Sequence, residues 1–406
     1  MPARWIVAAA WIVVALGACR PEASPAAPSP TAELPPSVTL TSADQPPGPV
    51  VALAVLPDGD LLAGVGPSGD PDTGLAHYLY RGHGDRWQRL MWPDEAPVRT
   101  LRVGGNLDGT VIFVVPRSSA LFGVGQPWGL LRSTDGGQSW QQALKGLNDP
   151  FVVDVALSPA FETDRTLVAV TWHTGVFIST DAGDSWQSLS PGQAIEPGGG
   201  ASPYDLAVAL SPDFRGLNRG EIVASYGHSM HLWRASQQVW HSVAYTVTTR
   251  SEDIEPPEAR LAAAAIAFSP TFAIDATLYI YSAYAGLWRS TDGGETWSLA
   301  DRGLPTPSPS RPVLQLTTVS TDEVFALLPP QESNAAVAGG TPTTAAPTLY
   351  RTRDGGRTWQ ALQEPLPPGG VSAFYVSPGA EGELVLYLGG VYGGVISQPA
   401  DEGVWQ

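Results

Sequence analysis

Residues 133–140 read STDGGQSW, and similar eight-residue stretches recur at 179–186 (STDAGDSW), 290–297 (STDGGETW) and 352–359 (TRDGGRTW). Each stretch places Ser or Thr first, Asp third, Gly fifth and Trp eighth. A motif that returns with fixed internal spacing indicates a repeat architecture, in which each copy belongs to one supersecondary unit. The number of units and the distances between them therefore decide the fold.

Three degenerate relatives of this motif extend the series. With the preceding residues included, the pattern also appears as LYRGHGDRW at 79–87, LWRASQQVW at 232–240 and VISQPADEGVW at 395–405. The final tryptophans are separated by 46 to 62 residues and are Trp87, Trp140, Trp186, Trp240, Trp297, Trp359 and Trp405. The sequence therefore predicts seven repeat units.

A strand pair precedes the motif in most units. Apolar segments that end in Ser-Pro are followed by a short turn and a second apolar segment, as in VVDVALSPAFETDRTLVAV (152–170) and AAIAFSPTFAIDATLYIYS (264–282). Short apolar runs bounded by Gly and Pro are typical of strands. We interpret each unit as four antiparallel strands, a to d, with the Asp motif in the c–d turn. Seven such units predict an all-β fold, a single seven-bladed β-propeller over residues 37–406.

Closure of the ring requires a fourth strand for the last blade, because the chain stops one residue after the seventh tryptophan. The segment SVTLT at 37–41 precedes the first unit. We predict that it supplies this strand by pairing with the strand around Val395–Ser397.

The first residues predict export. Residues 1–18 contain Arg4 and an apolar run that is too short to span a bilayer, as in a signal peptide. The sequence LGAC resembles the bacterial lipobox, which implies cleavage before Cys19 and lipidation of its thiol. An ordinary signal peptide cleaved near Ala18, or a short membrane anchor, are the alternatives. Residues 19–36 are rich in Pro, Ala and Ser and predict an extended tether. We therefore expect an exported protein, lipid-anchored at the outer face of a bacterial membrane.

Charge and composition exclude several classes of function. The chain has 22 basic and 39 acidic residues, a formal charge of −17 and no basic run, which argues against nucleic acid as a partner. Cys19 is the only cysteine, so there is no disulfide framework and no cysteine metal cluster. Nucleophile-elbow, phosphate-loop and zinc-protease motifs are absent from the sequence. We expect a monomer without cofactor or metal.

The eight-residue motif resembles the Asp box, or bacterial neuraminidase repeat, of sialidases, xyloglucanases, sortilin-type receptors and photosystem II assembly factors. Its Asp can accept hydrogen bonds from its own turn, its Gly can adopt positive φ, and its Trp can cover the end of the blade. One carboxylate at the key position of each box is too few for a calcium ion. We therefore predict a structural role for Ser133, Asp135, Gly137, Trp140, Ser179, Asp181, Gly183, Trp186, Ser290, Asp292, Gly294, Trp297, Thr352, Asp354, Gly356 and Trp359.

The face opposite the boxes should carry the b–c turns and the loops between blades. Most of these b–c turns contain an aromatic residue or a histidine, which could stack on sugars, contact a peptide or pack between blades. The long loops at 187–205 and 241–261 lie on the same side, and function often resides in such loops. The candidate binding residues are Trp128, Trp172, His173, Tyr204, Tyr226, His228, Tyr284 and Tyr392.

Two functions remain open after the family patterns are compared with this sequence. Sialidases carry an Arg-Ile-Pro motif and six blades, whereas this chain has no such motif and seven units. Xyloglucanases have two propellers with similar units, and photosystem assembly factors are single seven-bladed propellers that bind proteins. We therefore predict a non-enzymatic binding module for a protein or a glycan. The alternative is a glycoside hydrolase, which needs a carboxylate pair such as Asp154 and Asp205.

Overall fold

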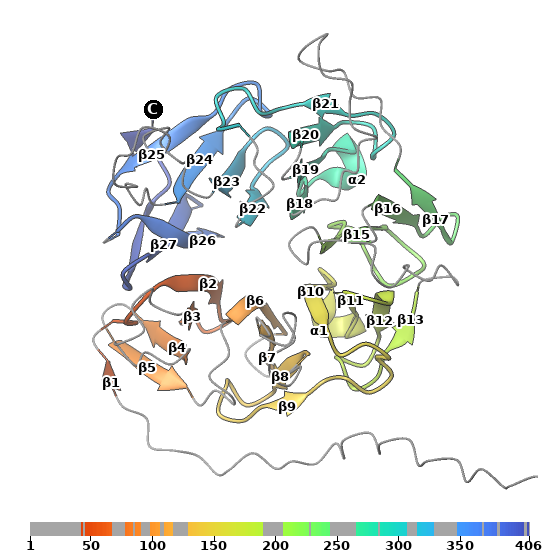
Figure 1. Ribbon diagram of the computed structural model, residues 1–406, viewed down its shortest axis with the longest axis horizontal. Coiled ribbons are helices and arrows are strands. Elements are labelled where there is room, and N and C mark those ends of the chain that lie inside the picture. The colour runs from red at the N-terminus through yellow and green to blue at the C-terminus, as the bar shows by residue number, and fades with distance from the viewer. Residues whose placement is uncertain are drawn as a thin grey trace, which may run out of the picture. The chain divides into compact units, whose positions relative to one another are not determined.

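Seven antiparallel sheets follow one another along the chain and form a ring (Figure 1). The computed structural model describes residues 42–43, 45–66, 78–83, 86–90, 98–105, 109–116, 129–189, 206–226, 229–243, 265–282, 285–306, 315–328, 347–367, 369–379, 382–401 and 404–405. The chain divides into the units Met1–Glu33 and Leu34–Gln406, and all described residues belong to the second. The predicted seven-bladed all-β propeller is confirmed.

Blades 1 to 4 each contain a meander of four strands in the order a to d. Blade 1 is built from β2 (Val50–Val55), β3 (Leu61–Val65), β4 (Tyr78–His83) and β5 (Arg86–Leu90). Blade 2 is built from β6 (Val98–Gly104), β7 (Val111–Pro116), β8 (Leu131–Ser133) and β9 (Gln141–Gln142). Blade 3 contains β10 (Val152–Leu157), β11 (Leu167–Thr171), β12 (Gly175–Ser179) and β13 (Gln187–Ser188). Blade 4 contains β14 (Ala207–Leu210), β15 (Glu221–Tyr226), β16 (Ser229–Arg234) and β17 (Val239–Ser242).

Blades 5 to 7 continue the same plan. Blade 5 contains β18 (Ala265–Phe268), β19 (Leu278–Ser282), β20 (Gly286–Ser290) and β21 (Ser298–Leu299). Blade 6 contains β22 (Gln315–Thr318), β23 (Val324–Leu328), β24 (Thr348–Thr352) and β25 (Gln360–Glu364). Blade 7 has three described strands, β26 (Val371–Pro378), β27 (Leu384–Gly390) and β28 (Val395–Pro399). Two short helices, α1 (Phe161–Asp164) and α2 (Phe272–Asp275), lie in the a–b turns of blades 3 and 5.

The hydrophobic core lies between neighbouring blades because each sheet is buried on both faces. The innermost strands β2, β6, β10, β14, β18, β22 and β26 contact one another in this order, and β26 contacts β2. Phe113 of blade 2 and Phe177 of blade 3 belong to one such cluster and are almost fully buried. Burying a side chain of this size stabilises the fold by roughly 1.5–3 kcal/mol.

The blade 7–blade 1 junction is sealed by packing in the described part of the chain. Val50, Leu53 and Ala373 belong to one core cluster across this junction. The Ser372 hydroxyl donates a hydrogen bond of 2.7 Å to the Val50 carbonyl oxygen. The innermost strands of the first and last blades therefore hold the ring closed.

The termini add short strands to blades 1 and 6. Strand β1 (Ser42–Ala43) pairs with β5, and β29 (Val404–Trp405) pairs with β25. Pro47 forms an antiparallel bridge with Gly393, so the N-terminal segment also contacts the β27–β28 turn of blade 7. Residues 37–41 lie outside the described residues, and their pairing with Val395–Ser397 stays a prediction.

The Asp boxes close their turns through one repeated set of hydrogen bonds. In the first box the Ser133 hydroxyl donates to Asp135 Oδ1 at 2.7 Å, and the Gly137 amide donates to the Ser133 hydroxyl at 2.8 Å. The Ser139 amide donates to Asp135 Oδ1 at 2.9 Å. Burial alone raises the pKa of Asp135, but hydrogen bonds from Ser139 and Ser133 outweigh burial and lower the pKa. The same arrangement surrounds Asp181, Asp292 and Asp354.

Arginines that precede three boxes or their degenerate relatives join each blade to the next. Each guanidinium donates to a backbone carbonyl in the following c–d turn, at 2.6–3.0 Å. The pairs are Arg132 with Ala182, Arg234 with Gly293 and Arg351 with Ala400. The contacts therefore link blades 2 and 3, 4 and 5, and 6 and 7 on the Asp-box face.

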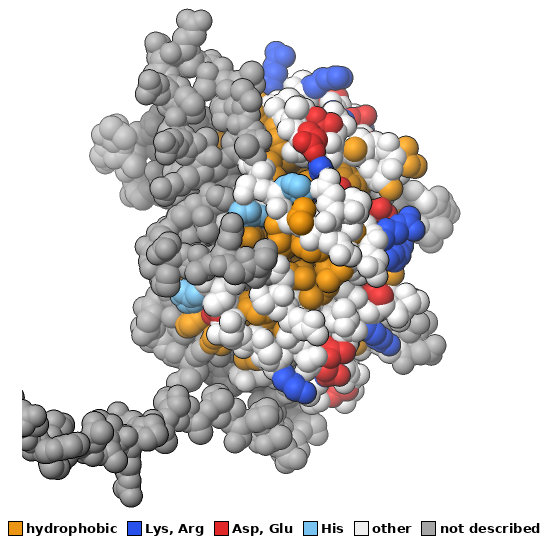
Figure 2. Space-filling model, turned by 90° about the vertical axis from the view of Figure 1, so that its right-hand side faces the viewer, with side chains coloured by type: hydrophobic (Ala, Val, Ile, Leu, Met, Phe, Trp, Pro, Cys, Tyr) orange, Lys and Arg blue, Asp and Glu red, His pale blue; other side chains and the backbone are white. Residues whose placement is uncertain are grey.

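Blades 3 and 4 are joined by aromatic packing instead. Ile178 holds the position in blade 3 that an arginine holds before the box in blade 2. The core cluster between these blades includes Trp233, and half-buried Trp240 packs against it. Figure 2 shows hydrophobic side chains at the surface on the side of the ring where β13 and β17 lie. Val239 in β17 keeps 46% of its surface exposed.

A partly buried carboxylate, that of Glu221, lies at the junction of blades 4 and 5. Glu221 Oε2 is buried and has no hydrogen-bond partner in the described part of the chain. Arg234 Nε lies 3.5 Å from the other oxygen, Oε1. Burial raises the pKa of Glu221 to about 7, although the charge of Arg234 opposes the shift.

We predict that Glu221→Gln changes how stability depends on pH. The pKa of Glu221 in the folded state is about 7, above the ordinary value of 4.5, so the folded protein binds more protons between these values. Its contribution to stability is present below about pH 4.5 and is lost as the pH rises through about 7. Glu221→Gln should flatten this decline in urea-unfolding midpoints from pH 4.5 to 8. An unchanged pH profile in the variant would contradict the prediction.

Candidate functional site

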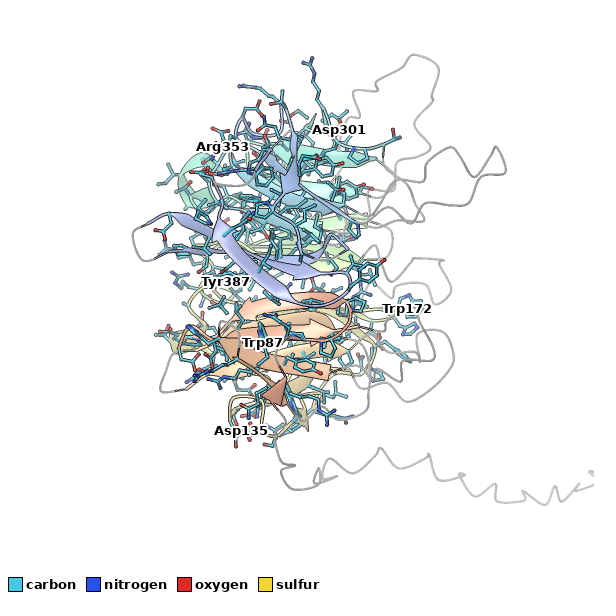
Figure 3. The ribbon with its side chains drawn as sticks, turned by 90° about the vertical axis from the view of Figure 1, so that its left-hand side faces the viewer. Trp87, Asp135, Trp172, Asp301, Arg353 and Tyr387 are labelled. Carbon is cyan, nitrogen blue, oxygen red and sulfur yellow. The ribbon has the colours of Figure 1, made fainter. Side chains whose placement is uncertain are left out.

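The two faces of the ring carry different turns. The a–b and c–d turns share one face, because the Ala182 amide of a box donates to the Arg165 carbonyl of an a–b turn at 2.8 Å. Figure 3 places Asp135 and Arg353 at this face and Trp172 at the opposite one. The b–c turns and the inter-blade loops therefore form the face on which binding residues were predicted.

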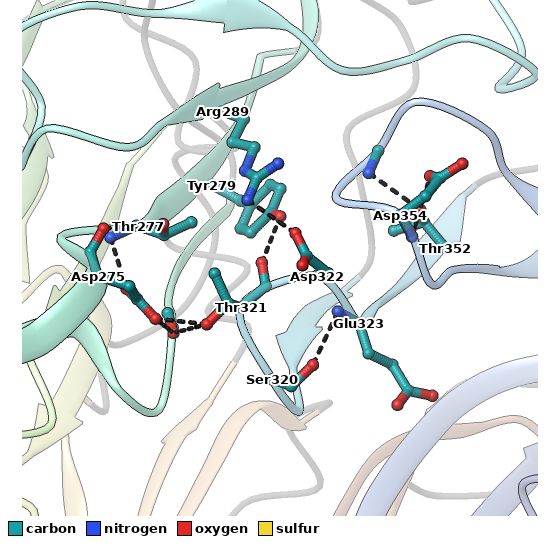
Figure 4. A network of polar contacts seen from close by, with 12 residues as sticks. Asp275, Thr277, Tyr279, Arg289, Ser320, Thr321, Asp322, Glu323, Thr352 and Asp354 are labelled. Carbon is teal, nitrogen blue, oxygen red and sulfur yellow. Dashed lines mark hydrogen bonds and ion pairs between the residues drawn. The ribbon is translucent and has the colours of Figure 1, made fainter.

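The Asp-box face carries a polar network between blades 5 and 6 (Figure 4). Asp275 Oδ2 accepts hydrogen bonds from Thr271 at 2.6 Å, from Ser269 at 2.7 Å and from Thr321. Burial raises the pKa of Asp275, but these hydroxyls outweigh burial and lower it to about 2. The Tyr279 hydroxyl donates to the Thr321 carbonyl at 2.8 Å. Asp275 and Tyr279 belong to blade 5 and Thr321 to blade 6, so these hydrogen bonds join the two blades.

On the opposite face, three aromatic rings form a cluster at the start of blade 3. Trp172 and His173 occupy the β11–β12 turn, and their rings stack with centroids 5.3 Å apart and an interplanar angle of 18°. Phe151, which precedes β10, packs edge-on against His173 at 5.2 Å and against Trp172 at 6.5 Å. The Trp172 amide donates to the Phe151 carbonyl at 3.0 Å. The structure thus brings together two predicted binding residues and one that was not predicted.

A buried carboxylate anchors this cluster. Asp149 is 3% exposed and lies in the loop between blades 2 and 3. Its Oδ2 accepts a hydrogen bond from the His173 amide at 2.7 Å, and its Oδ1 accepts one from the Phe151 amide at 3.0 Å. The His173 ring nitrogen Nδ1 lies 3.3 Å from Oδ1. The carboxylate therefore ties the loop, the turn and the imidazole together, and we call Asp149, Phe151, Trp172 and His173 the aromatic site.

Tyr226 does not occupy an exposed rim. It is 4% exposed, and its ring stacks on His231 with centroids 4.2 Å apart. Trp240 packs edge-on against it at 6.3 Å. Burial raises the pKa of Tyr226 and is the main cause that lowers the pKa of His231. The expectation that the Tyr226 ring is available for stacking on a ligand is corrected, because the ring is buried and packs against His231 and Trp240.

Tyr392 is exposed but stands apart from the aromatic site. It lies in the β27–β28 turn and keeps 73% of its surface exposed. A Cβ at Gly369 would lie 2.5 Å from the Tyr392 ring, so the glycine allows the ring to rest on the backbone. Tyr392 belongs to blade 7 and the aromatic site to blade 3, and these blades are not neighbours.

The remaining predicted residues on this face lie outside the described residues. They are Trp128, Tyr204, Asp205, His228 and Tyr284, and Cys19 is also outside them. Within the described ranges, no three His, Cys, Asp or Glu side chains are grouped in a way that could hold a metal ion. Neither described helix has the length and apolar character needed to cross a membrane.

The Asp154 carboxylate accepts hydrogen bonds from residues of three blades. Its Oδ1 accepts hydrogen bonds from the Val155 amide at 2.9 Å, the Thr100 hydroxyl at 3.3 Å and the Arg102 guanidinium at 3.4 Å. Its Oδ2 accepts one from the Val208 amide at 3.2 Å. Since Thr100 and Arg102 belong to blade 2 and Val208 to blade 4, Asp154 joins the innermost strands of blades 2, 3 and 4.

Sequence analysis did not single out Asp149 and Phe151. The signal available in the sequence was the segment NDPF at 148–151, directly before the first strand of blade 3. An Asp before Pro is typical of a turn, so the residue types alone predict a loop. Asp149 can hold His173 only because this loop and the β11–β12 turn lie close together in the folded chain.

The comparisons with known proteins agree with the fold. The family BNR/Asp-box repeat matches residues 288–299, which include the third complete box. YCF48 from Cyanidioschyzon merolae is similar in structure, with a TM-score of 0.51 and 16% identity over 90% of this chain and 100% of that chain. A comparison of the sequence with curated proteins gave no significant match.

Two further structures come from other functional classes. The extracellular domain of BT4673 from B. thetaiotaomicron has a TM-score of 0.53 and 12% identity over 91% of this chain, which spans 44% of that one. A GH74 enzyme from Niastella koreensis has a TM-score of 0.44 and 12% identity over 88% of this chain and 65% of that chain. At these identities the likeness concerns the fold and does not decide between binding and hydrolysis. The chain is thus a seven-bladed β-propeller with repeated Asp boxes, and one of these boxes matches the BNR/Asp-box repeat family.

Proposed function

We propose that this propeller is a non-enzymatic, exported and surface-anchored module that binds a protein or a glycan through the face opposite the Asp boxes. The observation that carries the proposal is the aromatic site. His173 keeps 46% of its side-chain surface exposed, although its partner Asp149 is buried. Exposed rings held by a rigid scaffold offer contact area at little cost in conformational entropy.

The contacts of Asp154 support binding over hydrolysis. A glycosidase needs one carboxyl group that gives its proton to the glycosidic oxygen and a second that attacks or activates water. Both oxygens of Asp154 accept hydrogen bonds from neighbouring strands. A role in joining blades 2, 3 and 4 accounts for this residue.

We predict that the aromatic site carries affinity. In an array screen of neutral glycans and of peptides with the purified protein, Trp172→Ala and His173→Ala should each weaken binding about tenfold, because central aromatic contacts dominate interfaces. Titration calorimetry on the strongest array hit measures the change. Arg353→Ala is the matched control, because this exposed side chain lies on the Asp-box face (Figure 3).

Two outcomes would contradict the proposal. One is a hit whose affinity is unchanged by both aromatic substitutions, and the other is release of reducing sugar from the glycans. If sugar is released, Asp154→Ala and Asp205→Ala test the hydrolase alternative directly.

A further inference from the structure

The contact between His173 and Asp149 determines which ring nitrogen carries the proton. A carboxylate can only accept hydrogen bonds, so a ring nitrogen that points at it must bear a hydrogen. The Asp149 carboxylate accepts hydrogen bonds from two backbone N–H groups at 2.7 and 3.0 Å. The Nδ1 atom of His173 lies 3.3 Å from this carboxylate and is therefore the N–H donor.

The other ring nitrogen, Nε2, does not contact Asp149. In a neutral imidazole one nitrogen donates and the other accepts, so Nε2 carries a lone pair when Nδ1 carries the hydrogen. Within the described residues, no hydrogen bond to Nε2 is present and Asp149 is the only charged group that pairs with the ring. The stacked Trp172 ring and the perpendicular Phe151 ring hold the imidazole plane.

We propose that Asp149 is a positioning residue that fixes the Nδ1–H tautomer of His173, so that Nε2 accepts a hydrogen bond from a hydroxyl or N–H group of the ligand. The part of this inference that concerns the ligand rests on the proposed function. The chain carries a formal charge of −17 and the Asp149 carboxylate lies 3.3 Å from Nδ1 of the ring, so an anionic group is disfavoured. The aromatic site therefore selects neutral or cationic hydrogen-bond donors.

The tautomer is tested without any ligand. Long-range ¹H–¹⁵N correlation spectra of the full chain should show a protonated Nδ1 and an unprotonated Nε2 for His173, assigned by the loss of its signals in His173→Gln. In Asp149→Asn the ring should change toward a mixture of tautomers, and the backbone amide signals of the other blades report whether the fold is kept. A wild-type spectrum with a protonated Nε2 overturns the inference, whatever the variant does.

The acceptor role is tested with small probes of defined chemistry. Methyl β-glucopyranoside supplies hydroxyl donors, N-methylacetamide supplies an N–H donor, and the fully O-methylated glucoside is the matched control without donors. At least one donor probe should shift Nε2 of His173, and Asp149→Asn should weaken that binding about three- to tenfold. An equal shift with the O-methylated control overturns the acceptor role. If no probe shifts Nε2 while the tautomer is as expected, both the proposed binding face and the part of the inference that concerns the ligand fail, and the positioning of His173 by Asp149 stands.

Discussion

Replacing Trp186 with alanine is expected to lower the free energy of unfolding by about 3–5 kcal/mol, as for other large buried aromatic side chains. Trp186 is 4% exposed and lies in the core cluster between blades 2 and 3. Its indole nitrogen donates a hydrogen bond of 2.8 Å to the Ala143 carbonyl of the preceding blade. The substitution therefore opens a cavity at a blade junction and removes a partner from a buried carbonyl. Urea unfolding followed by tryptophan fluorescence measures the loss.

Two further variants test the contribution of the indole N–H group and that of burial. Trp186→Phe keeps most of the ring but loses the N–H donor, and it should cost about 1–3 kcal/mol. Trp240→Ala removes the equivalent residue of blade 4, which is only half-buried, and should cost less than Trp186→Ala. Equal losses at Trp186 and Trp240 would contradict the view that burial at the blade junction sets the effect.

Replacing Arg351 with alanine is expected to cost about 3–5 kcal/mol, as when one partner of a buried ion pair is removed. The Arg351 side chain is 4% exposed, and its Nε donates to Glu323 at 2.6 Å. Its Nη1 donates to the Ala400 carbonyl at 2.9 Å, and its guanidinium lies 5.5 Å from the Trp405 ring centroid. The alanine variant leaves Glu323, which is 19% exposed, without its main partner and loosens blade 6 from blade 7.

Arg353, two residues further along the chain, provides the matched control. It also pairs with Asp401 and with Glu323, but its side chain is 57% exposed. Surface ion pairs contribute about 0–1 kcal/mol, because solvent and salt screen them. Arg353→Ala should therefore change the unfolding midpoint little. If both arginine variants lose the same stability, burial is not the cause.

The seven blades could be predicted from the sequence because the repeat is local. The box Ser, Asp and Gly hydrogen-bond to one another within a single turn, so their spacing is visible in the sequence and gives the number of blades. The degenerate copy that ends at Trp240 lacks the Asp and both Gly, and it is recognised by its LWR start and the position of its tryptophan. Its indole nitrogen donates to the Leu189 carbonyl of blade 3 at 2.9 Å. That position follows from the packing between blades.

Burial of the aromatic residues could be predicted only in part. The sequence places Trp172 and Tyr226 in b–c turns and predicts that they share one rim. Trp172 stacks with the half-exposed His173, whereas Tyr226 is enclosed by His231 and Trp240. The difference comes from neighbouring strands, so the turn sequences themselves do not contain it.

The sequence by itself determined the repeat, the blade count and the side of the ring on which to look for a site, because these depend on spacing and on the alternation of turns. The tertiary structure decided which residues come together in the candidate site. Asp149 and His173 are separated by 24 positions, and their contact exists because the inter-blade loop and the β11–β12 turn meet at one end of blade 3. A short-range motif records the hydrogen bonds of its own turn, whereas a contact between two loops depends on how the strands between them pack.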